Sequence, residues 1–304
     1  MRGIRERLMG TDVLLVLPPR DAAAVLGWLR EVERVFSRFR PDSDVSRANA
    51  GGRVRVSRLF LRVLHQACAY QARTGGLFSP FLGAELARLG YTRDFASIGT
   101  PPAAPPGRRP AGHPAGPPAP EVRLDHEDGT VLLPPGVAVD LGGFVKGWAV
   151  QAAARELRTP RGLIDAGGDL VAWRRAADPP WRVGVAHPQD PDGGPGAGVL
   201  PLPPRAAVAT SSVVRRSWRD TAGRRLHHLL DPRTGEPAGS DCLQATVVTG
   251  DLAAAEVYAT CLVILGTAEG PAWLARTDPD AGWVTIDRQG VVRHSPGLPL
   301  ERAA

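Results

Sequence analysis

The irregular order of strand-like and helix-like segments is the strongest constraint on the fold of this chain. Residues 12–18 have the apolar pattern of a strand, and residues 20–38 repeat apolar side chains at helical spacing. The same spacing predicts helices over residues 57–73, 145–157 and 251–265. Because these segments do not alternate as regular strand–helix–strand units, we expect an α+β fold rather than a doubly wound parallel sheet.

The segment from Thr100 to Pro120 is dense in Pro, Ala and Gly, which predicts a loop or a polyproline-like linker. The chain has 304 residues, of which 43% are hydrophobic. It can therefore bury a sizeable core, as one large domain or as two small ones. We interpret residues 100–120 as an insertion or loop within one domain.

The formal net charge of +6 invites a nucleic-acid partner. The arginines, however, are scattered in runs no longer than two, and no RNP, zinc-finger or basic-helix signature accompanies them. We therefore expect no nucleic-acid partner and at most a modest preference for an anionic ligand.

The cysteines and the N-terminus bear on the compartment. Cys68, Cys242 and Cys261 lie far apart without CxxC spacing, which favours buried thiols in a reducing compartment. The first residues lack the pattern of an export signal, and no window approaches eighteen uninterrupted apolar residues. We therefore expect a cytoplasmic protein without a membrane span.

Lysine is nearly absent from the chain. Lys and Arg total 37, and Lys146 is the only lysine, just as Asn49 is the only asparagine. A position that keeps lysine under this bias suits a compact charge with three rotatable donors, such as a tight phosphate site requires. Chance retention of a single lysine is the alternative.

Lys146 belongs to the segment Asp140–Gly147, in which a strand runs through two glycines into the start of a helix. Glycines let backbone N–H groups approach a ligand, and a helix N-terminus favours anions. Lys146 in that first turn could reach a phosphate. The alternative is an ordinary strand–helix turn with an exposed lysine. The glycine turn of Asp165–Asp169 is similarly either a site element or a plain hairpin turn.

Two further segments carry polar side chains. Adjacent His227 and His228 on a strand point to opposite faces, so one of them can enter a site, and an Asp231 turn nearby suits proton transfer. Glu256 and Thr260 share one helix face and form an oxygen pair suited to Mg²⁺. The alternatives are a surface histidine pair, an exposed glutamate and a threonine that bonds back to its own helix.

Together and in this order, the segments resemble those of the FAD:protein FMN transferase (ApbE) family. The resemblance spans residues 9–266, nearly the whole chain. It is carried by Met9–Thr11, Ser37–Asn49, Gly76–Pro80, Asp140–Gly147, Asp165–Asp169, Thr210–Ser211, His228–Gly235 and Ala255–Thr260.

The resemblance implies a single ApbE-like domain over residues 1–304, with mixed, largely antiparallel sheets and packed helices. It also implies a Mg²⁺-dependent reaction. FAD is bound, its pyrophosphate is cleaved, and FMN passes to a Ser or Thr hydroxyl of an acceptor protein while AMP leaves. We expect a monomer or a homodimer. Hydrolysis of FAD to FMN and AMP, and flavin binding without catalysis, are the alternatives.

By position in the family's motifs, the resemblance implies the roles of individual residues. His228 and Lys146 match the charged groups near the flavin and the reacting phosphate, and are expected to be catalytic. The expected metal ligands are Glu256, Thr260 and the backbone carbonyl of Gly143. The expected FAD-binding residues are Met9, Ser43, Asn49, Ser79, Asp140, Lys146, Gly167, Gly168, Asp169, Thr210, Ser211 and His228.

Three positions depart from the family's pattern. Glu256 stands where aspartate is usual, which we expect to weaken or re-aim the metal. Ser79 replaces the acid of a Gly-x-Phe-Asp-Pro motif, which removes one polar contact to the flavin. Ser212 replaces the glycine of Thr-Ser-Gly and adds a side chain where close approach is expected.

Overall fold

A computed structural model describes residues 3–101, 119–190 and 196–302. The chain forms two compact units, which we call the sheet unit and the helical unit. The sheet unit comprises Met1–Leu29, Lys146–Arg215 and Gly239–Ala304, and the helical unit comprises Arg30–Val145 and Arg216–Ala238. The single domain over residues 1–304 stays a prediction. Most of the expected insertion at 100–120 falls on residues 102–118, outside the described residues.

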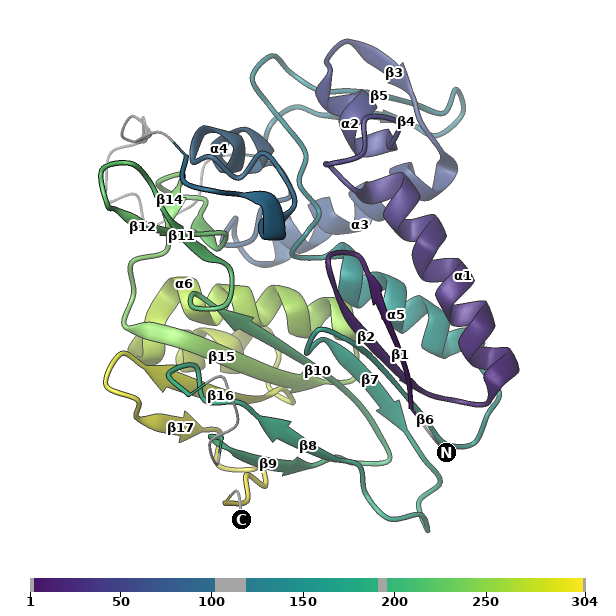
Figure 1. The fold of residues 1–304 in the computed structure, drawn as a ribbon, viewed down its shortest axis with the longest axis vertical. Helices are drawn as coiled ribbons and strands as arrows, with labels where there is room; N and C mark the ends of the chain where they lie inside the picture. The colour runs from purple at the N-terminus through teal and green to yellow at the C-terminus, as the bar shows by residue number, and fades with distance from the viewer. Residues whose placement is uncertain (1–2, 102–118, 191–195, 303–304) are drawn as a thin grey trace. The chain divides into compact units, whose positions relative to one another are not determined.

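An antiparallel sheet dominates the described part of the sheet unit (Figure 1). Its strands are hydrogen-bonded to their neighbours in the order β1-β2-β6-β7-β10-β15-β16-β17. The strands are β1 Ile4–Leu8, β2 Thr11–Val16, β6 Gly162–Ala166, β7 Leu170–Trp173, β10 Arg205–Ser212, β15 Cys242–Thr249, β16 Gly282–Asp287 and β17 Val292–His294. The expectation of an α+β fold with a largely antiparallel sheet is confirmed.

The two faces of this sheet are covered by different elements. The pair β8 (Arg182–Val185) and β9 (Gly198–Pro201) packs through Val185 and Leu200 against Ala206 and Val208 of β10. Helix α6 (Leu252–Thr277) contacts β10, β15 and β16. Successive side chains of a strand point to opposite faces, so β10 presents alternate residues to each layer.

Helix α6 extends past the expected residues 251–265 because it consists of two helical segments. Gly266 has φ 85° and ψ 176°, a conformation open essentially to glycine alone. The second segment then starts anew, with the Asp241 carboxylate accepting a hydrogen bond from the backbone N–H of Thr267 at 2.9 Å. Asp251 caps the first segment in the same way, by accepting from Ala254 N–H at 3.1 Å.

Helix α6 is also the one helix of the described residues that is long and apolar enough to cross a membrane by length and composition. Its most apolar window, however, is 72% buried inside the protein, as in the core helix of a folded domain. Its burial is explained by the sheet that it covers.

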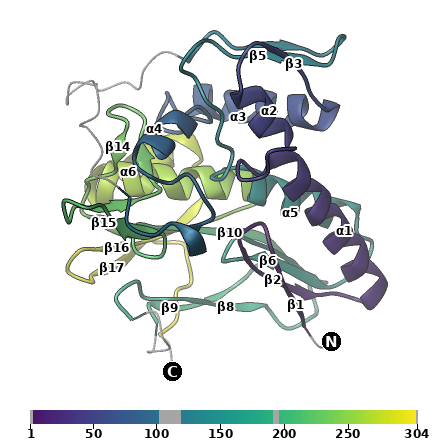
Figure 2. The same cartoon turned by 45° about the horizontal axis from the view of Figure 1, so that its top comes forward.

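The helical unit contains the end of α1 (Pro19–Phe36), α2 (Asp44–Asn49), α3 (Arg58–Arg73) and α4 (Gly83–Arg88). The three-stranded sheet β3-β5-β4 lies beside α2 and α3 (Figure 2). Its strands are β3 Arg53–Arg55, β5 Thr130–Leu132 and β4 Arg123–Asp125. The predicted helices over 20–38 and 57–73 are confirmed, and Ser57 caps α3 by accepting from Phe60 N–H at 3.1 Å.

Two hairpins complete the helical unit. They are β11 (Ser217–Arg219) with β12 (Arg225–His227), and β13 (Leu230–Asp231) with β14 (Glu236–Pro237). Trp218 and Leu226 of the first hairpin and Leu230 of the second share one apolar cluster with Leu89 and Tyr91. The Trp218 indole N–H donates to the Leu89 carbonyl at 3.1 Å, which satisfies its polar atom within the cluster.

Substitution of Gly266 tests the break in α6. In Gly266→Ala the new Cβ would lie 2.6 Å from Asp241 Oδ1 and the backbone would be held at a positive φ. We expect the free energy of unfolding in urea to fall by about 1–3 kcal/mol. Gly250→Ala is the control, since a Cβ there meets nothing within 4 Å. Equal stability of the two variants would contradict a strained Gly266.

Candidate functional site

Lys146, Asp169 and Glu256 form a buried cluster in the sheet unit, which we call the carboxylate–lysine cluster. Lys146 stands in the first turn of α5 (Val145–Glu156), Asp169 in the β6–β7 turn and Glu256 in α6. The Lys146 ammonium donates to Glu256 Oε1 at 2.8 Å and to Asp169 Oδ2. The three side chains are 13%, 5% and 5% exposed. The alternatives of an exposed lysine and an exposed glutamate are therefore wrong.

Gly147 explains why a glycine follows this lysine. Its backbone N–H donates to Glu256 Oε2 at 2.8 Å. A Cβ on Gly147 would lie 2.8 Å from that oxygen and 2.8 Å from the Leu252 carbonyl, so a side chain would push α5 away from α6. The Gln151 side chain of α5 also accepts from Leu252 N–H at 2.9 Å. Close packing of these two helices brings Lys146 to Glu256.

Burial raises the pKa of Glu256 from its ordinary value of 4.5 to about 7, against the opposing pull of the Lys146 charge. Asp169 adds to this rise, because a second negative charge disfavours ionisation of Glu256. The cluster with both acids ionised carries one positive and two negative charges. Its net charge in that ionised state is therefore negative by one charge.

The glycine turn of Asp165–Asp169 joins β6 to β7 and lies beside the start of β2. Gly167 and Gly168 have φ 73° and 97°, and Gly168 N–H donates to Asp165 Oδ1 at 2.7 Å. A Cβ on Gly167 would lie 1.9 Å from Thr11 Oγ1, so the turn packs tightly on the start of β2. Met9, in the β1–β2 turn, has φ 53°. The segments of Met9 and Gly167 are thus brought together.

Hydroxyl pairs connect β10 to its neighbours. Thr210 Oγ1 lies 2.9 Å from Thr246 Oγ1, and the Thr210 N–H donates to Asp169 Oδ1 at 3.3 Å. Ser211 Oγ lies 3.0 Å from Thr260 Oγ1. Thr260 thus pairs with the sheet, whereas the alternative had it bonding back to its own helix. Sequence reasoning missed Thr246, whose signal is its place opposite Thr210 in the β10–β15 register.

The predicted residues of the helical unit converge on one backbone segment. The Asn49 amide donates to the Val139 carbonyl at 2.9 Å and accepts from Val139 N–H at 2.7 Å. The next residue, Asp140, donates its N–H to the Pro80 carbonyl at 2.9 Å. Ser79, just before that proline, accepts from Gln71 Nε2 at 3.3 Å. The Asn49 side chain therefore pairs with the Val139 backbone through two hydrogen bonds, as a residue on a neighbouring strand would.

Asp140 and Ser43 each hold local backbone. Asp140 Oδ1 accepts from Gly142 N–H at 2.8 Å, which shapes the glycine turn that contains Gly143. Its Oδ2 lies 2.7 Å from Arg38 Nε. Ser43, fully buried, caps α2 by accepting from Ser46 N–H at 3.0 Å.

Arg38 was missed by sequence reasoning, although it stands inside the Ser37–Asn49 segment. Its guanidinium lies 4.4 Å and 4.3 Å from the ring centroids of Phe39 and Tyr91. It also donates to the Tyr91 carbonyl at 2.6 Å. Nothing in its local sequence distinguishes it from the other arginines, because its partners are distant in the chain.

The two histidines have different surroundings; β12 ends at His227, and His228 lies just beyond it. His227 is buried, with Nε2 3.2 Å from the Ala238 carbonyl. His228 is partly buried, and its Nδ1 lies 3.3 Å from the Arg216 carbonyl. A proton on Nδ1 would serve that contact and leave Nε2 as the basic nitrogen. The Asp231 carboxylate accepts from Arg233 at 2.8 to 3.0 Å, so it fixes its own turn.

The sheet unit contains oxygen donors of the kind that magnesium prefers. No group of three or more His, Cys, Asp and Glu side chains among the described residues could hold a metal alone. Magnesium is commonly bound by one or two carboxylates, with waters and substrate phosphates completing its shell. Asp169 and Glu256 supply two carboxylates, Thr260 supplies a hydroxyl, and the cluster lacks one cation.

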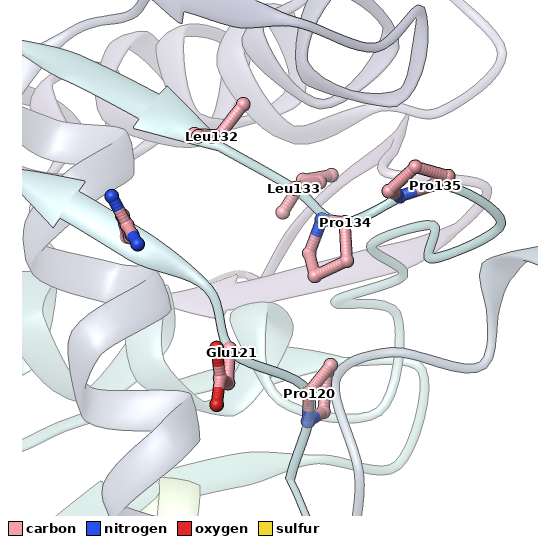
Figure 3. Close-up of a pocket in the computed structure, with 7 residues that line it drawn as sticks. Pro120, Glu121, Leu132, Leu133, Pro134 and Pro135 are labelled. Carbon is pink, nitrogen blue, oxygen red and sulfur yellow. The ribbon is translucent and has the colours of Figure 1, made fainter.

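A shallow pocket of about 570 Å³ lies elsewhere in the helical unit (Figure 3). Its lining consists of Pro120, Glu121, Arg123, Leu132, Leu133, Pro134 and Pro135. None of the predicted site residues borders it.

Comparison with known proteins gives consistent results. The sequence matches the ApbE family over residues 9–283. It is 30% identical over 302 residues to the FAD:protein FMN transferase of Klebsiella pneumoniae strain 342, covering 95% of this chain and 90% of that protein. It is 29% identical to the protein of that name from Treponema pallidum strain Nichols, covering 93% and 83%. The crystal structure of the ApbE protein of Thermotoga maritima superposes with TM-score 0.81 and 25% identity, over 97% of both chains.

Removal of the lysine charge tests the carboxylate–lysine cluster. In Lys146→Met both buried carboxylates lose their cation, and we expect a loss of about 3 kcal/mol of unfolding free energy at pH 8. Arg155→Met in the same helix is the control, because its ion pair with Asp251 is exposed and worth at most about 1 kcal/mol. A Lys146→Met protein as stable as the control would contradict the cluster.

The raised pKa of Glu256 predicts a pH dependence of stability without metal. The folded protein holds this proton to a higher pH than the unfolded chain, so the stabilisation is full below about pH 4.5 and is lost as pH rises to about 7. Glu256→Gln cannot titrate there. Relative to the wild type, we expect the unfolding free energy of Glu256→Gln to rise by about 3 kcal/mol across this window, measured with a chelator present. Parallel pH profiles would show that burial does not hold the proton.

Proposed function

This chain belongs to the ApbE family, and we propose that it transfers the FMN moiety of FAD to a Ser or Thr hydroxyl of an acceptor protein. The relatives that it matches nearly end to end are named FAD:protein FMN transferases. The observation that carries the proposal is the carboxylate–lysine cluster, since three separate segments of the family pattern meet in it.

Magnesium is part of this proposal. Glu256 and Thr260 would hold the ion together with Asp169, and the Gly143 carbonyl stays a predicted further ligand. When bound, the ion supplies the cation that the cluster lacks and neutralises charge on a pyrophosphate. The Glu256 side chain is one methylene longer than that of the usual aspartate. Its carboxylate accepts hydrogen bonds from Gly147 N–H and from the Lys146 ammonium, so the added length serves these contacts within the cluster.

The chain's own groups then have distinct tasks. The Lys146 ammonium has three rotatable donors, so it can bind a phosphoryl oxygen while it still contacts a carboxylate. In the transfer, the acceptor hydroxyl oxygen bonds to the FMN phosphorus, the pyrophosphate P–O bond breaks, and AMP leaves. His228 Nε2 takes the hydroxyl proton as general base. We propose that FAD is also contacted by Met9, Gly167, Gly168, Thr210 and Ser211.

The helical unit is proposed to contribute FAD contacts through Ser43, Asn49, Ser79 and Asp140. In the structure Asn49 and Asp140 hold backbone at residues 139–142, so we propose that these two act mainly by shaping that segment. Ser43 caps α2, and Ser79 accepts from Gln71. We further propose a cytoplasmic location. The three cysteines are unbridged, and burial raises the pKa of Cys68 to about 11 and that of Cys242 to about 12, which keeps both as neutral thiols.

The reaction is tested with pure protein, FAD, Mg²⁺ and a flavoprotein fragment that carries a candidate Ser or Thr. We expect covalent flavin fluorescence on the fragment and one AMP released for each flavin attached. Glu256→Ala should raise the Mg²⁺ concentration for half-maximal rate by about tenfold or more, since one carboxylate ligand is lost. The matched control is Glu269→Ala, an exposed glutamate of the same helix.

Two outcomes would contradict the proposal. Free FMN and AMP with an unlabelled fragment would indicate a hydrolase, and intact FAD on a yellow protein would indicate a carrier. If Glu256→Ala and Glu269→Ala respond to Mg²⁺ alike, the proposed ligand is wrong even where the transfer occurs.

A further inference from the structure

The hairpin that leads into His228 places two arginines directly opposite each other. In the register of β11 with β12, Arg219 faces Arg225 and Trp218 faces Leu226. Trp218 and Leu226 are buried in the apolar cluster, 6% and 1% exposed. Side chains alternate along a strand, so Arg219 and Arg225 point to the opposite face, where both are exposed.

Like charges directly opposite on neighbouring strands destabilise a hairpin. Arg219 donates to the Gly223 carbonyl at 2.8 Å, and Arg225 donates to Ser217 Oγ at 3.2 Å, so both partners are neutral. Within the described parts of the chain neither guanidinium forms an ion pair. The repulsion between them is therefore not offset by a neighbouring acid.

The acids near this hairpin are committed to other arginines. Asp220 lies 3.2 Å from Arg224 and also accepts from the Arg224 N–H. Asp231 pairs with Arg233, and Glu236 pairs with Arg88 at 2.7 Å. At the hairpin tip, Thr221 N–H donates to the Pro101 carbonyl. The sequence of the residues that follow, 102–118, contains two arginines and no acid.

Two like charges without a neighbouring acid are unfavourable in a hairpin whose other face is a well-packed apolar pair. Such local conflicts are typical of functional surfaces. Two exposed guanidinium groups on one face match carboxylates, which they can bind with paired hydrogen bonds. The hairpin continues directly from His227 into His228, the proposed general base. A segment bound on this face would therefore dock beside the strand end that carries the base.

We propose that Arg219 and Arg225 form a docking surface for an acidic segment of the acceptor protein. The identity of this partner rests on the proposed function, whereas the preference for acidic peptide follows from the hairpin alone. Charges on an exposed surface mainly accelerate association and set its salt dependence. The surface should thus govern KM for the acceptor and leave the chemistry on FAD unaffected.

The proposal is tested with two fluorescein-labelled peptides, each containing one Thr, that differ only by four Glu in place of four Gln. Anisotropy should show that the wild type binds the Glu peptide about tenfold more tightly at low salt, with the preference shrinking as salt rises. Arg225→Glu should abolish this preference. The same substitution should leave the urea midpoint of unfolding unchanged or raise it slightly, because Glu opposite Arg219 forms a favourable cross-strand pair.

Arg58→Glu is the matched control, with the same change of charge at an exposed arginine of the helical unit. It stands in the first turn of α3, where an acid is favourable, so it too should fold normally. If Arg58→Glu weakens binding of the Glu peptide as much as Arg225→Glu does, net charge governs the binding and the surface is refuted. Lack of preference in the wild type, or equal competition by a single-stranded oligonucleotide, refutes an acidic-peptide site as well.

The outcomes separate this inference from the proposed function. If FMN transfer proceeds with the same acceptor KM in the wild type and in Arg225→Glu, the docking surface is wrong and the transferase stands. If the wild type binds the Glu peptide selectively but never transfers FMN, the proposed function is wrong and the peptide site stands. Consumption of FAD without acceptor should be equal in both proteins.

Discussion

Two carboxylates and one ammonium group lie buried together where α5 and α6 meet the β6–β7 turn. Burial of a charge is tolerated only when partners offset the lost hydration, and here Lys146 serves Asp169 and Glu256 at once. The approach of α5 to α6 at Gly147, the tight turn at Gly167 and the cap of α6 all bring these three groups together. With both acids ionised, the two carboxylates and the single ammonium leave the cluster with a net negative charge.

The only lysine and the only asparagine of the chain both proved to be structurally engaged. An ammonium serves two carboxylates without the planar fork of a guanidinium, and a side-chain amide can replace a strand by donating and accepting at once. Aspartate offers no donor for the Val139 carbonyl, and arginine offers no acceptor for the Val139 N–H. A strong compositional bias thus makes the exceptions informative, because each retained residue performs a task that the favoured types cannot.

Local patterns predicted the helices well and the site only in part. The periods of residues 57–73 and 145–157 depend on neighbours within a few positions, and α3 and α5 begin and end within one or two residues of those limits. Lys146, Asp169 and Glu256 were found because each stands in a recognisable segment. Arg38 and Thr246 were missed because their roles arise from partners fifty residues or about thirty-five residues away. The extension of α6 was missed because its second segment depends on Asp241, from another part of the chain.

The break at Gly266 divides α6 into two helical pieces that pack on each other, with the ring centroids of Tyr258 and Trp273 5.8 Å apart. In a continuous helix, each residue added or removed rotates the following residues by about 100° about the helix axis, and all residues share one axis. Here the backbone leaves the helical conformation at Gly266, and the next residue, Thr267, donates its N–H to the Asp241 carboxylate. The change of direction at Gly266 therefore returns the C-terminal piece onto the first piece, while Glu256 and Thr260 keep their contacts with α5 and β10.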